Sequence, residues 1–237
     1  MGNFPVRTAA IAQLRCRTFP WLADRHDAAA RLTLAAAGFA PVTSIAAGAF
    51  GADLRSVAIW VLLPLLSATA LVLSRRPLVA ALVPAALLAG AIATLLYDAY
   101  RFGFLGVGLM HEDPIPHIGV ALHLQPHWVF GYLWRYLGNG GGLAVAFVAL
   151  GLSGVRAGVL YGLFVCSGLL VTLVASPYGE QLLWPLTTTT LVMAVGGHVI
   201  YGAGLGWITA HRSGPRRSGT RPGVASTRQH QPSRRDS

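Results

Sequence analysis

The stretch SVAIWVLLPLLSATALVLS, residues Ser56–Ser74, contains no charged side chain. An α-helix rises about 1.5 Å per residue, so a run of roughly 20 apolar residues crosses a hydrocarbon core of about 30 Å. This stretch therefore predicts a transmembrane helix. The whole chain agrees with it: 54% of the 237 residues are hydrophobic, 11% are charged and the mean hydropathy is +0.57. That composition excludes an ordinary soluble domain.

Five other apolar runs are long enough to cross a bilayer, which predicts an all-α, polytopic transmembrane helix bundle of about six spans. In it, a four-helix core is preceded by two N-terminal helices. The first run is rich in Ala and Gly, contains Pro41 and follows basic residues, as a signal peptide would, so five spans stay an alternative. The six expected spans are approximately Thr33–Phe50, Ser56–Ser74, Leu78–Asp98, Trp128–Leu152, Ala157–Ala175 and Leu186–Ile208.

Arginine positions predict the orientation of this bundle, because Lys and Arg near the ends of spans favour the cytoplasmic side. With six spans and both termini inside, fifteen of the 18 basic residues are cytoplasmic, Arg55 and Arg101 are outside, and Arg135 lies within the fourth span. We therefore expect a bacterial cytoplasmic (inner) membrane protein. Its parts would be a basic cytoplasmic segment (1–32), the bundle (33–208) with an extracytoplasmic loop at about 99–127, and a disordered Arg-rich cytoplasmic tail (209–237).

The net charge of +10 is concentrated at the two ends of the chain, so it indicates topology and not a nucleic-acid surface. The predicted partner is the lipid bilayer, with anionic lipids attracted by the Arg-rich termini. Another membrane protein is an alternative partner, and nucleic acid is not predicted. Cys16 lies in the basic segment and Cys166 in an apolar run, so no disulfide is expected between them.

The expected outer loop contains the histidine-rich stretch MHEDPIPHIGVALHLQPH, residues 110–127. It resembles the start of a short amphipathic helix with Asp113 as N-cap and Pro114 at the first helical position, and such a helix would lie on the outer leaflet. His117 and His123 would not share a face of it, and Pro126 would interrupt the helix between His123 and His127, which have the i, i+4 spacing. No cofactor is predicted, but a metal site stays open as a minority alternative with the ligands His111, His117, His123 and His127.

Three ionisable or strongly polar residues lie well inside the expected spans: Arg135, Asn139 and His198. Polar residues at this depth usually face the interior of the bundle and are functional candidates. Counting from the outer ends of their spans places Asn139 and His198 at the same level near the midplane. Arg135, one turn above Asn139, needs an acidic partner, which we expect to be Asp98 or an acid of the loop.

Glycines surround these positions on the fourth, fifth and last spans and predict close helix–helix contacts there. The run Gly138–Gly142 is also able to bend its helix or open a pocket. Tyr161 and Tyr201, each followed by glycine, are expected to anchor the cytoplasmic end of the bundle.

The second half of the chain resembles a family of small bacterial integral membrane proteins of unknown function. The similarity lies in LAGAIATLLYDAYRFG (88–103), DPIPHIGVAL (113–122), LGNGGGLAVAFVAL (137–150), GVLYGLFV (158–165) and GGHVIYGAGLGW (196–207). It implies a four-span core and no activity. Where that family tends to have a histidine one turn before the NG pair, this chain has Arg135 and Tyr136, which speaks against a metal held there with His198. The resemblance marks Tyr97, Asp98, Arg101, Asp113, Asn139, Gly140, His198 and Tyr201.

We therefore expect a protein that is not an enzyme and that binds or passes a small solute or lipid through a polar intramembrane pocket. The first alternative is a membrane enzyme or redox protein with a metal in the histidine-rich loop, although no nucleophile motif or carboxylate pair supports catalysis. The second is a structural subunit of a membrane complex. The expected pocket residues are Tyr97, Asp98, Arg101, Arg135, Asn139, His198 and Tyr201.

Overall fold

The computed structural model describes residues 25–212, and these residues form helices and no strand. The long elements are α2 (Arg25–Ala49), a continuous helix through α3 (Leu54–Val57), η2 (Ala58–Leu62) and α4 (Leu63–Ser74), then α6 (Leu82–Gly106), α10 (Val155–Ala175) and α12 (Thr188–Arg212). Short helices connect them: α5 (Pro77–Ala80), α7 (Ile115–Ala121) and α11 (Gly179–Leu182). Predictions for residues 1–24 and 213–237, including the terminal basic segments and Cys16, lie outside the described part.

Five helical segments are long and apolar enough to cross a membrane: Arg25–Ala49, Leu54–Ser74, Pro77–Gly106, Val155–Ala175 and Thr188–His211. The chain therefore has the properties of a multi-pass membrane protein. The weak first run, expected over Thr33–Phe50, is one of the five. The expected third span continues past Asp98 to Gly106, so the connection that follows is shorter than expected and begins at residue 107.

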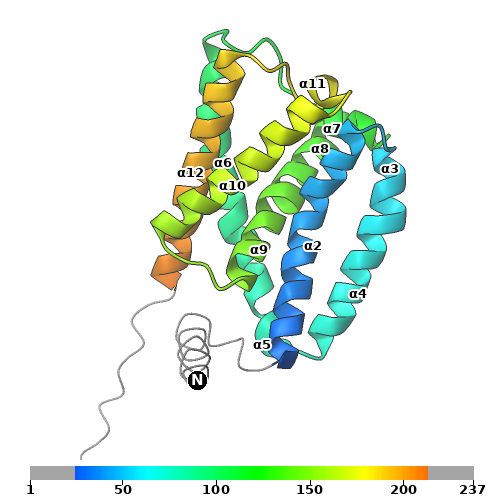
Figure 1. Cartoon of the computed structure of the whole chain (residues 1–237), viewed down its shortest axis with the longest axis vertical. Helices are drawn as coiled ribbons and strands as arrows, with labels where there is room; N and C mark the ends of the chain where they lie inside the picture. The colour runs from blue at the N-terminus through cyan, green and yellow to red at the C-terminus, as the bar shows by residue number, and fades with distance from the viewer. Residues whose placement is uncertain (1–24, 213–237) are drawn as a thin grey trace, which may run out of the picture.

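The expected fourth span, Trp128–Leu152, differs from the other five. It forms one uninterrupted helix over residues 127–149, made of α8 (His127–Leu133), the π-helical η3 (Trp134–Gly141) and α9 (Gly142–Ala149). It is less apolar because η3 carries Arg135, Asn139 and several glycines. Nearly every residue of α9 is buried, and Figure 1 shows this helix between α2 and α6. A helix surrounded by other helices does not need the uniformly apolar surface that lipid requires.

The helices alternate in direction, so the connections gather at two ends of the bundle (Figure 1). The start of α2, the turn from α4 to α5, the turn from α9 to α10 and the end of α12 share one end. Four of the arginines near the ends of helices lie there: Arg25, Arg75, Arg76 and Arg156. The connections that hold Arg55, α7 and α11 share the other end, which we call the loop end.

Glycines bring the main helices into backbone contact, as their sequence pattern predicts. A Cβ atom on Gly158 of α10 would lie 2.0 Å from the carbonyl oxygen of Gly202 on α12, and one on Gly162 would lie 2.2 Å from that of His198. On α2, a Cβ atom at Gly38 would lie 2.4 Å from the Gly142 carbonyl oxygen. Side chains larger than hydrogen therefore do not fit at these crossings.

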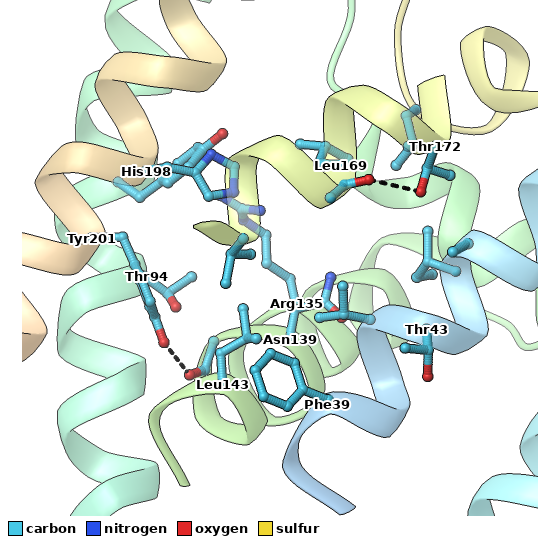
Figure 2. Close-up of a pocket in the computed structure, with 18 of the residues that line it drawn as sticks. Phe39, Thr43, Thr94, Arg135, Asn139, Leu143, Leu169, Thr172, His198 and Tyr201 are labelled. Carbon is cyan, nitrogen blue, oxygen red and sulfur yellow. Dashed lines mark hydrogen bonds between the residues drawn. The ribbon is translucent and has the colours of Figure 1, made fainter. Parts of the chain in front are cut away.

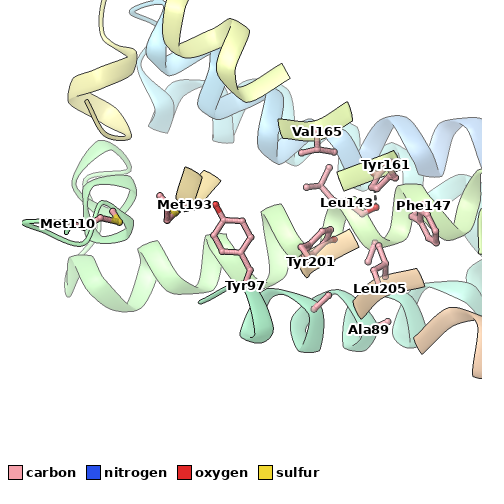
Figure 3. Packing of buried hydrophobic residues seen from close by; sticks show 12 residues of the cluster. Ala89, Tyr97, Met110, Leu143, Phe147, Tyr161, Val165, Met193, Tyr201 and Leu205 are labelled. Atoms are coloured by element: carbon pink, nitrogen blue, oxygen red, sulfur yellow. Dashed lines mark hydrogen bonds between the residues drawn. The ribbon is translucent and has the colours of Figure 1, made fainter. Parts of the chain in front are cut away.

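The largest apolar cluster lies where α6, α9, α10 and α12 meet. Its buried members include Tyr97, Phe147, Met193 and Leu205, and Figure 3 shows the large side chains of the cluster following one another along the bundle. Cys166 is a buried free thiol. This core holds α6, η3 and α12 in the positions from which they present the polar residues described next.

Candidate functional site

The acidic partner of Arg135 is Asp98, one of the partners expected from the sequence. Arg135 on η3 donates from Nε to Asp98 Oδ1 at 2.7 Å and Oδ2 at 3.0 Å, and its Nη2 also donates to Oδ1. Arg101, one turn further along α6, donates from Nε to Asp98 Oδ1 at 3.1 Å. Asp98 is fully buried and Arg101 is 1% exposed. One carboxylate thus holds two arginines inside the bundle.

Arg101 uses all three of its guanidinium nitrogens. Besides Asp98, it binds Asp113 Oδ1 through Nη1 at 2.5 Å and the Tyr132 hydroxyl through Nη2 at 3.1 Å. The Tyr132 hydroxyl donates to Asp113 Oδ2 at 2.6 Å. Two arginines and two aspartates form a network without net charge, which a buried site requires. We therefore interpret Arg101 as a structural residue: its hydrogen bond to Asp113 holds the connection after α6 against the bundle.

Asp113 also starts α7, by accepting a hydrogen bond from the Ile115 backbone N–H at 3.1 Å. The helix begins at Ile115, one residue later than predicted. Ile115, Ile118 and Leu122 are buried against the end of the bundle. The interfacial position expected for this segment is therefore wrong for these residues, because the Asp113 network draws the helix onto the bundle.

We expect Asp113 to make stability acid-dependent. Burial alone raises the pKa of its carboxyl, but hydrogen bonds from Tyr132 and the Ile115 N–H, together with Arg101, outweigh burial and hold the pKa below its ordinary value of 3.8. A carboxyl whose pKa is lowered in the folded state stabilises the fold at pH values above its ordinary pKa. That contribution is lost as the pH falls through the folded-state pKa.

Melting temperatures in detergent from about pH 7 to about pH 3 should show this loss of stability. In Asp113→Asn, the melting temperature should be lower at neutral pH and fall less on acidification; an unchanged pH profile would contradict this assignment.

The Tyr97 ring lies between Arg135 and His198. The Arg135 Cζ atom is 4.6 Å from the Tyr97 ring centre, and the His198 ring meets Tyr97 edge to face with centroids 5.3 Å apart. Figure 2 shows the Arg135 side chain reaching from η3 toward His198 on α12. His198 Nδ1 lies 2.7 Å from the Ala194 carbonyl oxygen, so Nδ1 carries the hydrogen and neutral His198 presents Nε2 as an acceptor.

Tyr201 and Tyr161 do not anchor an interface, contrary to expectation. Both are buried, and each hydroxyl donates to a backbone carbonyl oxygen of the η3–α9 helix: Tyr201 to Gly140 at 2.7 Å and Tyr161 to Leu143 at 2.8 Å. A switch from π- to α-helical pairing disturbs the regular carbonyl partners of a helix. We interpret both tyrosines as supports for η3, the element that presents Arg135 and Asn139.

A cavity of about 530 Å³ lies between α2, α6, η3, α10 and α12. Five of the seven expected pocket residues line it: Tyr97, Arg135, Asn139, His198 and Tyr201. Figure 2 labels the last four. Asp98 and Arg101 do not line it; Asp98 is bound to Arg135 and to Arg101. Most of the remaining wall is apolar. Sequence reasoning missed the contributions of α2, α10 and Trp184, since their apolar residues give no local signal that distinguishes a cavity wall from a lipid-facing surface.

The cavity reaches the side of the bundle through the middle of α10. Phe164, Gly168 and Val171 of α10 and Thr43 of α2 line it and are also exposed on the bundle surface. Phe39 and Phe164 meet edge to face across the two helices with centroids 6.4 Å apart. These residues lie inside two candidate spans, so in a bilayer that these helices cross the opening would face the hydrocarbon core.

Two buried polar atoms that belong to cavity-lining residues have no hydrogen-bond partner: Asn139 Oδ1 and Trp184 Nε1. Leaving such atoms unpaired costs about 1–3 kcal/mol each. Native structures seldom tolerate that cost without a reason, and both atoms belong to side chains that line one cavity, although the atoms themselves are covered by protein.

The structure does not gather the loop histidines with other metal-ligating side chains. Within residues 25–212, no group of three or more His, Cys, Asp or Glu side chains is arranged to hold a metal ion. His127 Nδ1 lies 2.9 Å from the Leu124 carbonyl oxygen and its Nε2 lies 2.6 Å from the Gln125 side chain, so both ring nitrogens have protein neighbours. α7 ends at Ala121 and α8 starts at His127, as Pro126 predicts, so His123 and His127 do not share a helix.

A second, more open cleft of about 550 Å³ lies at the loop end. Asp53, His117 and Tyr178 line it together with Val120 of α7. The short helix α7 separates the two hollows, since Ile115 and Ile118 line the first and His117 and Val120 the second.

The fold and the cavity together define the class of the protein as a polytopic helical membrane protein with a mainly apolar intramembrane cavity. Comparisons with known proteins add no family: no family model matches the chain, and neither a curated protein nor a solved structure is significantly similar to it. The resemblance to the uncharacterised bacterial family therefore stays a prediction.

Proposed function

We propose that the protein binds an amphiphilic molecule of the lipid class in the cavity between α2, η3, α10 and α12. The observation that carries this proposal is a mainly apolar cavity lined by a few polar side chains, two of which, Asn139 and Trp184, each have a buried atom without a hydrogen-bond partner. An apolar chain would occupy the wall between α2 and α10, and a polar head would complete the hydrogen bonds.

The position of the opening supports a lipid-like ligand over a water-soluble one. A solute from water would have to cross hydrocarbon to reach an opening at Gly168, whereas a molecule already dissolved in the bilayer would reach it directly. The volume of about 530 Å³ suits a single acyl or isoprenoid chain better than a two-chain lipid.

We further propose the orientation and extent of the membrane part. The helix over residues 127–149 is taken as a sixth span, because it runs the length of the bundle between α2 and α6. The end with Arg75, Arg76 and Arg156 is assigned to the cytoplasmic side of a bacterial inner membrane by the positive-inside rule. Membership in the family that the second half of the chain resembles is part of the same proposal.

Gly168→Phe is expected to block the cavity while leaving the fold intact. A Cβ atom at Gly168 would meet nothing within 4 Å, so the new ring can be placed at the opening without a backbone clash. Native mass spectrometry of protein purified in mild detergent should show a co-purified amphiphile with the wild type and a several-fold loss with Gly168→Phe. Gly103→Phe is the matched control, because Gly103 also has open space around it and does not line the cavity. Equal ligand occupancy in the two variants, or no bound amphiphile in the wild type, contradicts the proposal.

A further inference from the structure

One of the residues that line the cavity, Arg135, has a guanidinium nitrogen that the protein leaves unused. Nε and Nη2 of Arg135 are bound to Asp98, and within the described part of the chain its third nitrogen, Nη1, has no hydrogen-bond partner. The indole Nε1–H of Trp184, on the same cavity, is a second free donor. Both groups are hydrogen-bond donors only, so they suit acceptor oxygens.

The charges around the cavity favour an anion. Arg135 is the one arginine that lines it, and no aspartate or glutamate among the described residues does so. Asp98 is fully buried behind Arg135 and is shared with Arg101, so its carboxylate is turned away from the cavity. A cationic head would therefore meet Arg135 without an acid to pair with. An anionic head would gain charge-assisted hydrogen bonds in surroundings of low dielectric constant.

Two acceptors complete the site. Neutral His198 keeps an Nε2 lone pair because its Nδ1 is bound to the Ala194 carbonyl, and Asn139 Oδ1 is buried without a partner. A head group with several acceptor oxygens and one O–H would match this mixture of donors and acceptors. A phosphate monoester in its singly charged form has the acceptor oxygens, the O–H and a negative charge, whereas a carboxylate has the acceptor oxygens and the charge.

We propose that the ligand is a single-chain amphiphile with an oxyacid head, a carboxylate or a phosphate monoester, bound at Arg135, Trp184 and Asn139. This inference rests on the proposed lipid-class ligand and adds the chemistry of its head. Asp98 already fixes the position of the Arg135 guanidinium group. Binding a ligand at its free nitrogen therefore adds little loss of side-chain entropy.

The test compares four ligands with the same oleyl chain: oleate, oleyl phosphate, oleyl alcohol and oleylamine. Their affinities are measured by titration calorimetry at neutral pH with the full-length protein, after its lipid has been exchanged for detergent. Oleate and oleyl phosphate should bind at least about tenfold more tightly than the alcohol, and the amine more weakly than the alcohol. Tighter binding of oleyl phosphate than of oleate identifies a phosphate monoester as the natural head, and the reverse identifies a fatty acid.

Variants at Asn139 test the placement without disturbing the ion pairs. Replacing Arg135 itself would leave Asp98 short of a partner and could prevent folding. Asn139→Asp adds a negative charge to the cavity and should lower the affinity for oleate by about tenfold or more with little effect on oleyl alcohol. Asn139→Leu is the matched control: it removes the amide without adding charge, so it should weaken the binding of all four ligands by a similar factor and keep the preference for the acids over the alcohol.

The outcomes separate this inference from the proposed function. Equal binding of all four ligands, with all four lost in Gly168→Phe, would overturn the oxyacid assignment and leave the lipid cavity standing. An undiminished preference for oleate in Asn139→Asp would also overturn it. Failure of every ligand to bind would overturn both.

Discussion

Asp98→Asn is expected to cost about 3–5 kcal/mol of folding free energy, the range for breaking a buried ion pair by removing one partner. Asp98 is the shared acceptor of Arg101 and Arg135, and all three lie inside the bundle. Asparagine retains the shape but leaves two guanidinium groups with one fewer negative charge. The measurement is the fraction of folded protein across an SDS titration, together with the melting temperature in mild detergent.

An exposed pair of the same chemistry provides the control for Asp98. Asp27 and Arg76 are 3.7 Å apart, with side chains 36% and 35% exposed. Such a pair contributes about 0–1 kcal/mol, so Asp27→Asn should unfold close to the wild type. If Asp98→Asn matched Asp27→Asn in both measurements, the buried network would not be a main support of the fold.

Gly202→Ala is expected to be the second most damaging change, with a loss of about 3 kcal/mol or a failure to fold. Its new Cβ atom would lie 2.2 Å from the Gly158 carbonyl oxygen, so α10 and α12 would have to separate. Separation of two packed helices costs contacts along their whole crossing, and overpacking alone typically costs about 1–3 kcal/mol. The yield of folded protein and the SDS titration measure the effect.

Gly168→Ala is the matched control on α10. A methyl group there meets nothing within 4 Å, and alanine favours the helical backbone by about 0.5–1 kcal/mol relative to glycine. This variant should be as stable as the wild type or slightly more stable. Equal losses at Gly202 and Gly168 would mean that helix propensity, and not contact between the helices, explains the glycines.

The sequence predicted the part of the site that depends on local chemistry. Arg135, Asn139 and His198 are polar residues in long apolar runs, and because such residues are costly in lipid, they were expected to face the interior. All three line the cavity, and Arg135 has its expected partner in Asp98.

Other features were mispredicted because they depend on neighbours that the sequence does not specify. α7 was expected on a lipid surface, but the interaction of Asp113 with Arg101 and Tyr132 draws it onto the bundle. Tyr201 was expected at an interface, but its hydroxyl binds the Gly140 carbonyl, 61 residues away in the chain. The helix over residues 127–149 is less apolar than the other spans because other helices, and not lipid, surround much of it.

The sequence by itself determined that this chain is a helical membrane protein, where its apolar runs lie, which polar residues they contain and where small residues allow close contact. These properties follow from hydropathy and side-chain size, which are read one segment at a time. The tertiary structure alone decided that α2, η3, α10 and α12 enclose a cavity and that Trp184 faces it. A cavity is the space that remains when helices cross at particular angles, and those angles result from contacts between residues far apart in the chain.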